Sequence, residues 1–381
     1  MKEIFRAVKN YFKYIDHLLF SLMIVSSGLG CVIIHSATLS FNSNKFIFVQ
    51  IAAIGLGILL FIISSAFDIE HLSSLWKWMF AFNLLMLASL QFLGTGMEST
   101  GNRSWIRFAG TGIQPAELGK IIFIITLARH MSLLKENINR VKSLLQLSVH
   151  IVLPTAFVAL FSSDTGMAIS YAVTALIMLF CAGVKFRWFA GLFAAFAVIT
   201  PILWNFVLRN YQKLRILVLF DPSLDAKTAF QLKMSKLALG SGMLTGQGYM
   251  KGTQTQLSRL PAKHTDFIFS VAGEEFGFFG CLGIVALLTG IITRCFYNAY
   301  RALTPEGALI CTGVGAMLLF QTFENIGMCV GVLPIIGLTL PFFSYGGSSI
   351  VSSFIALGIV AGIRMRSKIR NEHYDIRHMS E

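Results

Sequence analysis

The sequence predicts an all-α, polytopic membrane protein with about ten transmembrane helices, because apolar runs of roughly 20 residues recur along the whole chain. Of the 381 residues, 55% are hydrophobic and only 13% are charged. A soluble protein of this length would carry about twice that charged fraction. A membrane β-barrel would instead show short segments of alternating hydrophobicity. The largest loop between the runs falls between the seventh and eighth spans, and we expect it to be extracytoplasmic.

The apolar runs define the predicted spans in chain order. Their ranges are 18–37, 46–66, 73–93, 114–131, 146–162, 165–183, 187–207, 267–293, 307–334 and 343–363. Together they form a single transmembrane domain over residues 18–363. Residues 1–17 place apolar and basic side chains on different helical faces, which is typical of an amphipathic segment on the cytoplasmic membrane surface. Residues 364–381 form a basic cytoplasmic tail.

The distribution of lysine and arginine predicts the orientation. Basic residues concentrate before the first span, after the last, and in alternate loops, whereas the short loops opposite hold only Lys45, Arg103 and Arg107. Short basic loops stay in the cytoplasm. Because the number of spans is even, we expect both termini to be cytoplasmic.

The large loop, residues 208–266, is basic although it is expected to face outward. Attraction to anionic lipid headgroups and an anionic ligand at the outer surface both explain this charge. Within the loop, Phe230, Met234 and Leu237 share one helical face. This spacing predicts an amphipathic helix that lies in the outer membrane interface.

The most informative carboxylate is Asp266, which ends the large loop and immediately precedes the eighth span. A carboxylate at the mouth of a span is costly unless it has a partner or a function. Lys263, His264 and Thr265 precede it, so charges and water are within reach. We therefore interpret Asp266 as the centre of the chemistry.

Other polar and aromatic residues on the outer side allow two interpretations each. Glu117 and Lys120 are three residues apart and share a helical face, either as an ion pair only or as part of a site. Asp164 either caps the following helix or lines the site. Trp105 is either a membrane-interface residue or a platform for a sugar ring.

Further polar residues fall inside predicted spans. Glu274 and Glu275 point about 100° apart on a helix, so at least one is expected to bond to a neighbouring helix. Glu324 and Asn325 are expected to hold helices together. The glycines of residues 240–248 resemble a phosphate-binding loop, but no strand precedes them, as a nucleotide motif would require.

Several sequence blocks, spread over nearly the whole chain, resemble the shape, elongation, division and sporulation (SEDS) family, whose members include RodA and FtsW. They are Trp105-Ile106 with Gln114–Lys120, Ser163–Gly166, Leu239–Gly242 with His264–Phe269 and Gly273–Glu275, and Asn325–Met328 with Leu333-Pro334, Leu340–Phe342 and Ser344–Ser349. Gly252–Gln256 and Asn325–Met328 look like the RodA branch, whereas Leu338-Thr339 is closer to FtsW.

The resemblance implies a peptidoglycan glycosyltransferase in the bacterial cytoplasmic membrane. It would polymerise lipid II into glycan strands at the outer face, with inversion and release of undecaprenyl diphosphate, for cell elongation and shape. Implied partners are lipid II, the nascent glycan strand, membrane lipids and a class B penicillin-binding protein that cross-links the strands. We expect no nucleic-acid partner.

The implied mechanism assigns roles to the residues already singled out. Asp266 is the catalytic candidate, a general base for the acceptor sugar hydroxyl. The substrate-binding candidates are Trp105, Glu117, Lys120, Asp164, Arg215 and Lys263. Among these, Arg215 and Lys263 are expected to hold the diphosphate, and Glu117 and Lys120 to shape the cavity or orient Asp266. A Mg²⁺ or Mn²⁺ ion, with Asp266 as a ligand, is a further possibility.

Two other functions remain open, and so does the branch. A lipid II flippase would also carry charged residues in its spans, although it would need them deep in the bundle. A non-enzymatic scaffold for a penicillin-binding protein could use Glu324 and Asn325 as a partner surface. Within the family, a division enzyme of the FtsW kind is the alternative to an elongation enzyme.

Overall fold

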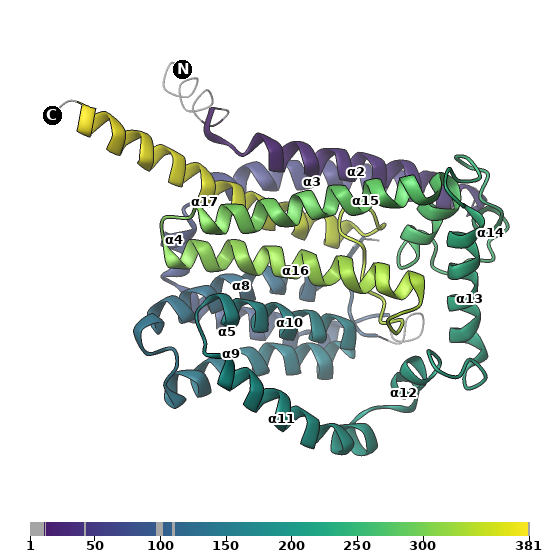
Figure 1. Ribbon diagram of the computed structural model, residues 1–381, viewed down its shortest axis with the longest axis horizontal. Helices are drawn as coiled ribbons and strands as arrows, with labels where there is room; N and C mark the ends of the chain where they lie inside the picture. The colour runs from purple at the N-terminus through teal and green to yellow at the C-terminus, as the bar shows by residue number, and fades with distance from the viewer. Residues whose placement is uncertain (1–10, 12, 42, 97–101, 109–110, 380–381) are drawn as a thin grey trace.

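A computed structural model describes residues 11, 13–41, 43–96, 102–108 and 111–379. Most helices run along one common axis and form a bundle (Figure 1). The expected amphipathic segment over residues 1–17 lies largely outside the described residues.

Every predicted span coincides with helical structure. The helices are α2 (His17–Thr38), α3 (Lys45–Ala66), α5 (Trp76–Ala88) with α6 (Leu90–Leu93), α8 (Pro115–Leu133), α9 (Val141–Phe157), α10 (Thr165–Cys181), α11 (Phe186–Ile202), α15 (Ile268–Tyr300), α16 (Pro305–Val330) and α17 (Gly347–Met379). Single π-helical turns, Val158–Ser162 and Leu203–Val207, extend α9 and α11. Among the described residues, 7 helices are long and apolar enough to cross a membrane. The exact number of spans stays a prediction.

The last two spans differ from their predicted limits for local backbone reasons. The ninth ends at Val330, four residues early, because Gly331 adopts a left-handed conformation with φ of 77° that closes the helix. The tenth begins at Gly347, four residues late. Residues 331–346 between them form an irregular segment that enters the bundle, and it becomes important at the site below.

The centre of the bundle is made by α16 and α17. In an 18-residue stretch of each helix, long enough to cross a membrane, 78% of α16 and 72% of α17 are buried, against 6% of α11. α16 packs against α8, α10 and α15, while α17 packs mainly against α3. α11 lies at the edge of the bundle (Figure 1), and near its start Phe189 contacts Phe180 of α10. Polar groups on α8, α10 and α16 therefore sit in the interior, as expected for ionisable residues within spans.

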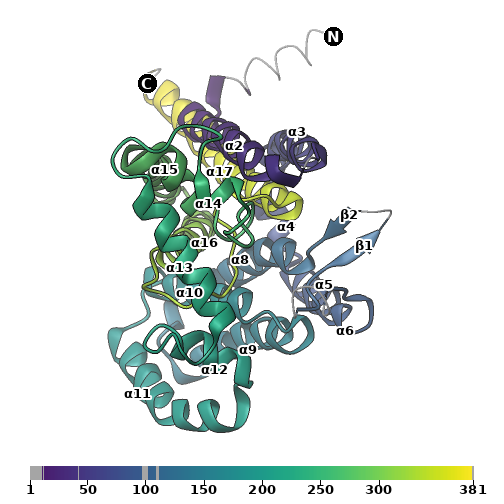
Figure 2. The same cartoon turned by 90° about the vertical axis from the view of Figure 1, so that its right-hand side faces the viewer.

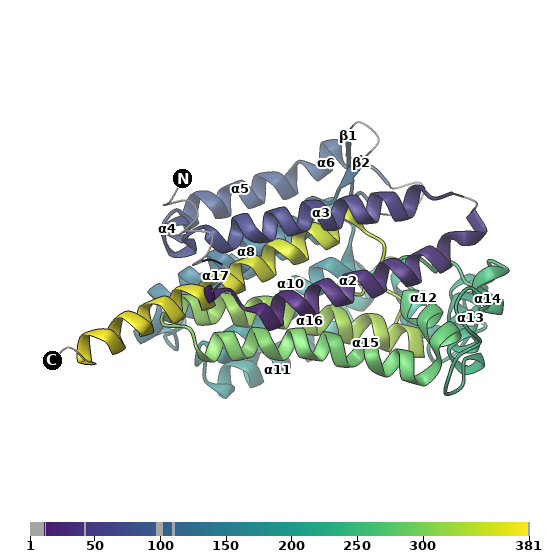
Figure 3. The ribbon, with the colours of Figure 1, turned by 90° about the horizontal axis from the view of Figure 1, so that it is seen from above.

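One end of the bundle carries the short elements. α12 (Asn210–Leu217), α13 (Ala226–Ser241) and α14 (Thr253–Gln256) cover this end, and Figure 2 views it face on. A hairpin of β1 (Ile106–Phe108) and β2 (Thr111–Ile113) pairs Ile106 with Ile113. α2 begins and α17 ends at the opposite end of the bundle (Figure 3).

The predicted helix within the large loop is present as α13, and its position in the outer membrane interface stays a prediction. Met234 is buried, whereas Phe230 and Leu237 remain 48% and 46% exposed. The buried side instead includes Leu232, Ser235 and Ala238, packed on α15 and α16. Ser235 fixes this side, because its hydroxyl donates to the Cys329 carbonyl at 2.7 Å and also contacts the Ser270 hydroxyl at 2.7 Å.

Candidate active site

Asp266 lies in a tight turn directly before α15, at the bundle end that carries α12, α13 and α14. One long-range hydrogen bond holds its backbone, and a second distant segment passes close to its side chain. Asn325 of α16 donates from Nδ2 to the Asp266 carbonyl at 2.8 Å. On the other side the backbone of Gly337 passes so close that an added Cβ would lie 3.4 Å from Asp266 Oδ2. The carboxylate is therefore only partly exposed and its position is fixed from two elements.

Burial raises the pKa of Asp266 to about 6. A hydrogen bond with Thr265 and the positive charge of Arg215 oppose this rise, whereas the charge of Asp164 adds to it. An aspartate with such a pKa remains mostly ionised at neutral pH and is a stronger base than an ordinary aspartate. This is the range in which general bases are most effective.

Asp164 is both a helix cap and a neighbour of the site. Its Oδ1 accepts a hydrogen bond from the Met167 backbone N–H at 3.0 Å, which caps α10 and confirms that interpretation. Its Oδ2 accepts from Ser104 Oγ at 3.2 Å and from Gln114 Nε2 at 3.5 Å. Burial raises the pKa of Asp164. Because its charge also acts on Asp266, capping and site membership are not exclusive.

Glu117 and Lys120 form the predicted ion pair, with Lys120 Nζ 2.9 Å from Glu117 Oε2. Both side chains are buried in α8, and Ser352 of α17 donates to the same carboxylate oxygen at 3.1 Å. The pair acts on the pKa of Asp164 with opposite signs, since Glu117 raises it and Lys120 lowers it. The pair thus belongs to the same electrostatic network as Asp266, because it acts on Asp164 and Asp164 acts on Asp266.

Arg215 is the basic residue of the large loop whose charge acts on Asp266. It lies on α12, partly buried, with its guanidinium 5.6 Å from the centre of the Tyr211 ring. The structure thus places Arg215 within electrostatic range of Asp266, although the two residues are far apart in sequence. An arginine held in this way can present a fork of donors to a phosphate.

Lys263 does not fit the expected diphosphate contact. Its side chain is 2% exposed, and Nζ donates to the Thr255 carbonyl at 2.5 Å, to Ser40 Oγ at 2.6 Å and to Ser258 Oγ at 3.3 Å. An ammonium group has only three N–H donors. All are therefore used within the protein. Lys263 ties the loop to the Leu39–Phe41 turn that follows α2, and in this conformation it has no donor left for a ligand.

Trp105 is fixed on the hairpin side of the site. Its carbonyl accepts hydrogen bonds from the Thr95 backbone at 2.7 Å and from the Thr95 hydroxyl at 2.8 Å. Its ring covers Gly112, where an added Cβ would approach within 2.9 Å. The neighbouring Ser104 connects this segment to Asp164. A partly exposed indole is thus held in place, although no contact links it directly to Asp266.

Glu274 and Glu275 both bond to neighbouring elements, whereas the buried Glu324 carboxylate has no hydrogen-bond partner among the described residues. Glu274 accepts from the backbone N–H groups of Gln254 and Thr255 at 2.7 and 3.0 Å, which fastens α14 to α15. Glu275 accepts from Ser36 Oγ of α2 at 2.5 Å. These contacts confirm the expectation that at least one of the two bonds to a neighbouring helix.

Glu324 and Asn325 are 1% and 0% exposed, so they cannot form a partner surface in this structure. The sequence suggested that Asn325 joins helices, but not that it positions Asp266. A second bond from its Nδ2 to the Leu338 carbonyl, at 2.8 Å, anchors the 331–346 segment beside the carboxylate. The same segment returns to the turn, because Ser344 Oγ donates to the Thr265 carbonyl at 2.6 Å. In the sequence, Gly337 was the residue that could have indicated this close approach to Asp266, because its φ of 78° is one that glycine adopts readily.

Within the described residues, no group of three or more His, Cys, Asp or Glu side chains could hold a metal ion. Mg²⁺ is commonly bound by one or two carboxylates together with substrate phosphates. Asp266 could supply one such carboxylate, and Asp164, whose charge raises the pKa of Asp266, is a second acid within electrostatic range.

The fold and the site define a helical membrane protein with a titratable carboxyl and an arginine at one end of its bundle. The family model of the FtsW/RodA/SpoVE cell cycle proteins matches residues 13–369. The peptidoglycan glycosyltransferase MrdB of Escherichia coli K12 is 33% identical over 84% of this chain and 86% of its own length. A probable peptidoglycan glycosyltransferase FtsW of Geobacter metallireducens is 36% identical over 75% of this chain and 76% of its own.

Solved structures agree with these relatives. A chain from a peptidoglycan synthase complex, described for its coordination of polymerization and crosslinking, superposes with a TM-score of 0.80 at 28% identity, covering 93% of this chain and 98% of the other. The rod shape determining protein RodA of Thermus thermophilus superposes with a TM-score of 0.69 at 26% identity, covering 92% and 96%. The chain belongs to the FtsW/RodA/SpoVE family.

Proposed function

We propose that this protein is a peptidoglycan glycosyltransferase that polymerises lipid II into glycan strands. The names of its relatives, MrdB and FtsW, support this class of activity. The observation that carries the proposal is Asp266, a partly exposed carboxyl with a pKa of about 6, beside Arg215 and at one end of a membrane-spanning bundle. Lipid II is a sugar-peptide on a lipid diphosphate, and this arrangement provides a base and a cation where the lipid would meet water.

In the proposed reaction, Asp266 accepts the proton of the acceptor sugar hydroxyl as its oxygen attacks the anomeric carbon of the growing strand. A new C–O bond forms with inversion, and the bond from that carbon to the diphosphate oxygen breaks. Undecaprenyl diphosphate leaves with the bonding electron pair. A diphosphate is already a good leaving group, so no second carboxylic acid is needed to protonate it.

The surrounding residues would position these groups. Arg215 is the candidate for the diphosphate contact, because its charge already reaches Asp266. Glu117 and Lys120 are buried and would act through Asp164 on the ionisation of Asp266 rather than touch the substrate. We assign Trp105 to a sugar or lipid contact near the entrance. A bound Mg²⁺ or Mn²⁺ on Asp266 would share the diphosphate charge.

We infer that the reaction takes place at the extracytoplasmic face and that both termini lie in the cytoplasm. The placement of α12, α13 and α14 opposite the beginning of α2 and the end of α17 supports this orientation (Figure 1). A class B penicillin-binding protein is the partner that we propose, by analogy with the structurally similar synthase complex. Relatives of both the MrdB and FtsW kinds match, and the RodA-like blocks of the sequence favour elongation over division.

The direct test is glycan synthesis by purified protein from lipid II in detergent, read on a gel. Asp266→Asn keeps the shape of the side chain and removes the base, which should lower the rate by about 10²–10⁴-fold. Asp221→Asn is the matched control, since Asp221 is an exposed acid in the same loop, and its carboxylate accepts hydrogen bonds only from Ser223 among the described residues. Full activity of Asp266→Asn would remove Asp266 from the mechanism. Absence of polymer from the wild type, with lipid II transport into vesicles, would favour the flippase.

A further inference from the structure

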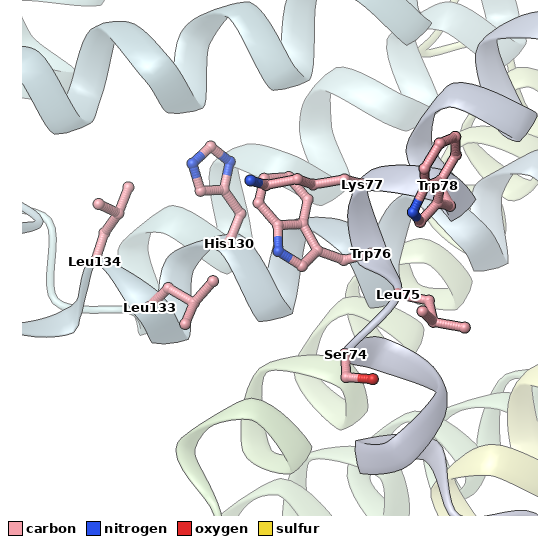
Figure 4. Close-up of a pocket in the computed structure, with 8 residues that line it drawn as sticks. All are labelled: Ser74, Leu75, Trp76, Lys77, Trp78, His130, Leu133 and Leu134. Carbon is pink, nitrogen blue, oxygen red and sulfur yellow. The ribbon is translucent and has the colours of Figure 1, made fainter.

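A pocket of about 520 Å³ opens between the start of α5 and the end of α8 (Figure 4). The start of α5 lies toward the end of the bundle where α17 ends, whereas α13 and α14 lie at the other end (Figure 3). The proposed glycosyl transfer uses none of the residues of the pocket. The pocket combines a cation, a histidine and an aromatic wall with an apolar rim, and each of these features restricts what it can bind.

The wall of the pocket is a preformed aromatic stack. The Trp76 ring stacks on His130 with ring centres 4.7 Å apart and an angle of 24° between the planes. It also stacks on the buried His150 at 5.8 Å and 20°. His130 Nδ1 and His150 Nδ1 are 3.1 Å apart and therefore share a proton in a hydrogen bond. Binding here would need little side-chain ordering, which reduces its entropic cost.

The hydrogen-bond chain behind the wall determines what His130 offers to a ligand. We assign the single hydroxyl proton of Thr126 to the Phe123 carbonyl, 3.1 Å away, which leaves the Thr126 oxygen to accept from His150 Nε2, also at 3.1 Å. His150 Nδ1 is then the acceptor for the Nδ1–H of His130. In neutral His130 the remaining nitrogen, Nε2, carries a lone pair. It can accept a hydrogen bond from a ligand in the pocket.

The mouth of the pocket pairs one cation with exposed apolar groups. Lys77 runs across the Trp76 ring with Nζ 5.9 Å from the ring centre, and no acidic side chain is among the described lining residues (Figure 4). Leu75, Trp78 and Leu133 are 54%, 77% and 56% exposed. In a membrane we expect such groups, exposed at the end of a membrane-length bundle, to lie at the lipid–water interface.

We propose that this pocket binds the headgroup of an anionic phospholipid whose phosphate diester carries a hydroxyl-bearing alcohol, as in phosphatidylglycerol. The Lys77 ammonium would contact the phosphate. His130 Nε2 would accept a hydrogen bond from the headgroup hydroxyl, and the acyl chains would follow Leu75 and Trp78. A choline headgroup has no hydroxyl to donate and neutralises its own phosphate, so the site would discriminate against it.

The test is native mass spectrometry of the delipidated full-length protein with short-chain lipids. Phosphatidylglycerol, phosphatidylmethanol and phosphatidylcholine are compared, because the first two have equal charge and only the first has hydroxyls. The variants are Lys77→Gln and His130→Phe, which keeps an aromatic ring in the stack. Lys142→Gln is the control, an exposed lysine on α9 that does not line the pocket.

Wild type should prefer phosphatidylglycerol over both other lipids. Lys77→Gln should weaken binding of both anionic lipids about fivefold, the contribution of one lysine near a lipid phosphate, while Lys142→Gln does not. His130→Phe should abolish the preference for phosphatidylglycerol over phosphatidylmethanol and leave binding of the latter unchanged. Equal affinity for phosphatidylglycerol and either other lipid in wild type, or equal losses in the two lysine variants, would overturn the proposal.

Discussion

At the residue scale, Asp266 is a base whose strength the neighbouring charges set. Burial raises its pKa to about 6, against an ordinary value of 3.8, and the Arg215 charge limits the rise. Below this pKa the carboxyl is protonated and cannot accept a proton from the substrate. The rate of polymerisation should therefore fall as pH drops through about 6 and level off above it. Initial rates between about pH 5 and 8 check this, and a rate that stays constant down to pH 5 would contradict it.

Replacement of Arg215 should shift this acidic limb of the pH–rate profile, the range in which the rate falls as pH drops. Its positive charge stabilises the ionised form of Asp266, so Arg215→Gln should raise the pKa of Asp266 and shift the acidic limb to higher pH. Capture of lipid II should weaken as well. Lys213→Gln, on the same helix, is the control, because Lys213 is not among the charges that act on Asp266. An acidic limb at the same pH in both variants would place Arg215 outside the site.

The buried pair of Glu117 and Lys120 makes a third prediction at this scale. Lys120→Met leaves the Glu117 carboxylate in the bundle without its partner cation, which typically costs about 3–5 kcal/mol of stability. The double variant Glu117→Gln, Lys120→Met removes both charges and should recover most of that loss. Thermal unfolding in detergent measures both, with exposed Lys135→Met as the control. A double variant as unstable as Lys120→Met alone would show that charge pairing is not the cause.

At the scale of elements, a break in α15 explains the glycine-rich segment 240–248. Gly277 has φ of 66° and ψ of −160°, which interrupts the helix. The N–H groups of Phe278 and Phe279 therefore donate to the carbonyls of Met243 and Leu244, at 2.9 and 3.3 Å. The glycines let this loop approach the α15 backbone closely. Their resemblance to a phosphate-binding loop reflects a shared need for close backbone approach, here between two parts of the protein.

This packing predicts that alanine has different effects on stability at two neighbouring glycines. A Cβ on Gly242 would lie 1.9 Å from the Gly273 carbonyl oxygen, whereas one on Gly240 meets no atom within 4 Å. Gly242→Ala should therefore destabilise the protein by about 1–3 kcal/mol through overpacking. Gly240→Ala, within α13, should be neutral or stabilising by up to about 1 kcal/mol. Unfolding midpoints in detergent provide the comparison, and equal midpoints would mean that the contact with α15 contributes nothing.

At the scale of the whole molecule, the sequence predicts features that depend on local composition, but not those that depend on contacts between distant residues. Each predicted span is helical because apolar run length is a local property. The ion pair of Glu117 and Lys120 was equally predictable, since three-residue spacing fixes it. The buried position of Lys263 was not, because its partner Ser40 is 223 residues away in sequence. The same holds for Asn325, which reaches Asp266 from 59 residues away.

The orientation of the whole bundle follows from charge and can be tested directly. The short elements around Asp266 lie at one end, and the beginning of α2 and the end of α17 lie at the other (Figure 1). If the short basic loops lie in the cytoplasm, the end that carries α12 and α13 lies outside. Alkaline phosphatase inserted after Leu224, an exposed position between α12 and α13, should then be active. Green fluorescent protein at the C-terminus should fluoresce, and alkaline phosphatase inserted after Asn137, between α8 and α9, should be inactive. The reverse pattern would put Asp266 on the cytoplasmic side, away from any growing wall, and the polymerase would then have to release its glycan on the wrong side of the membrane.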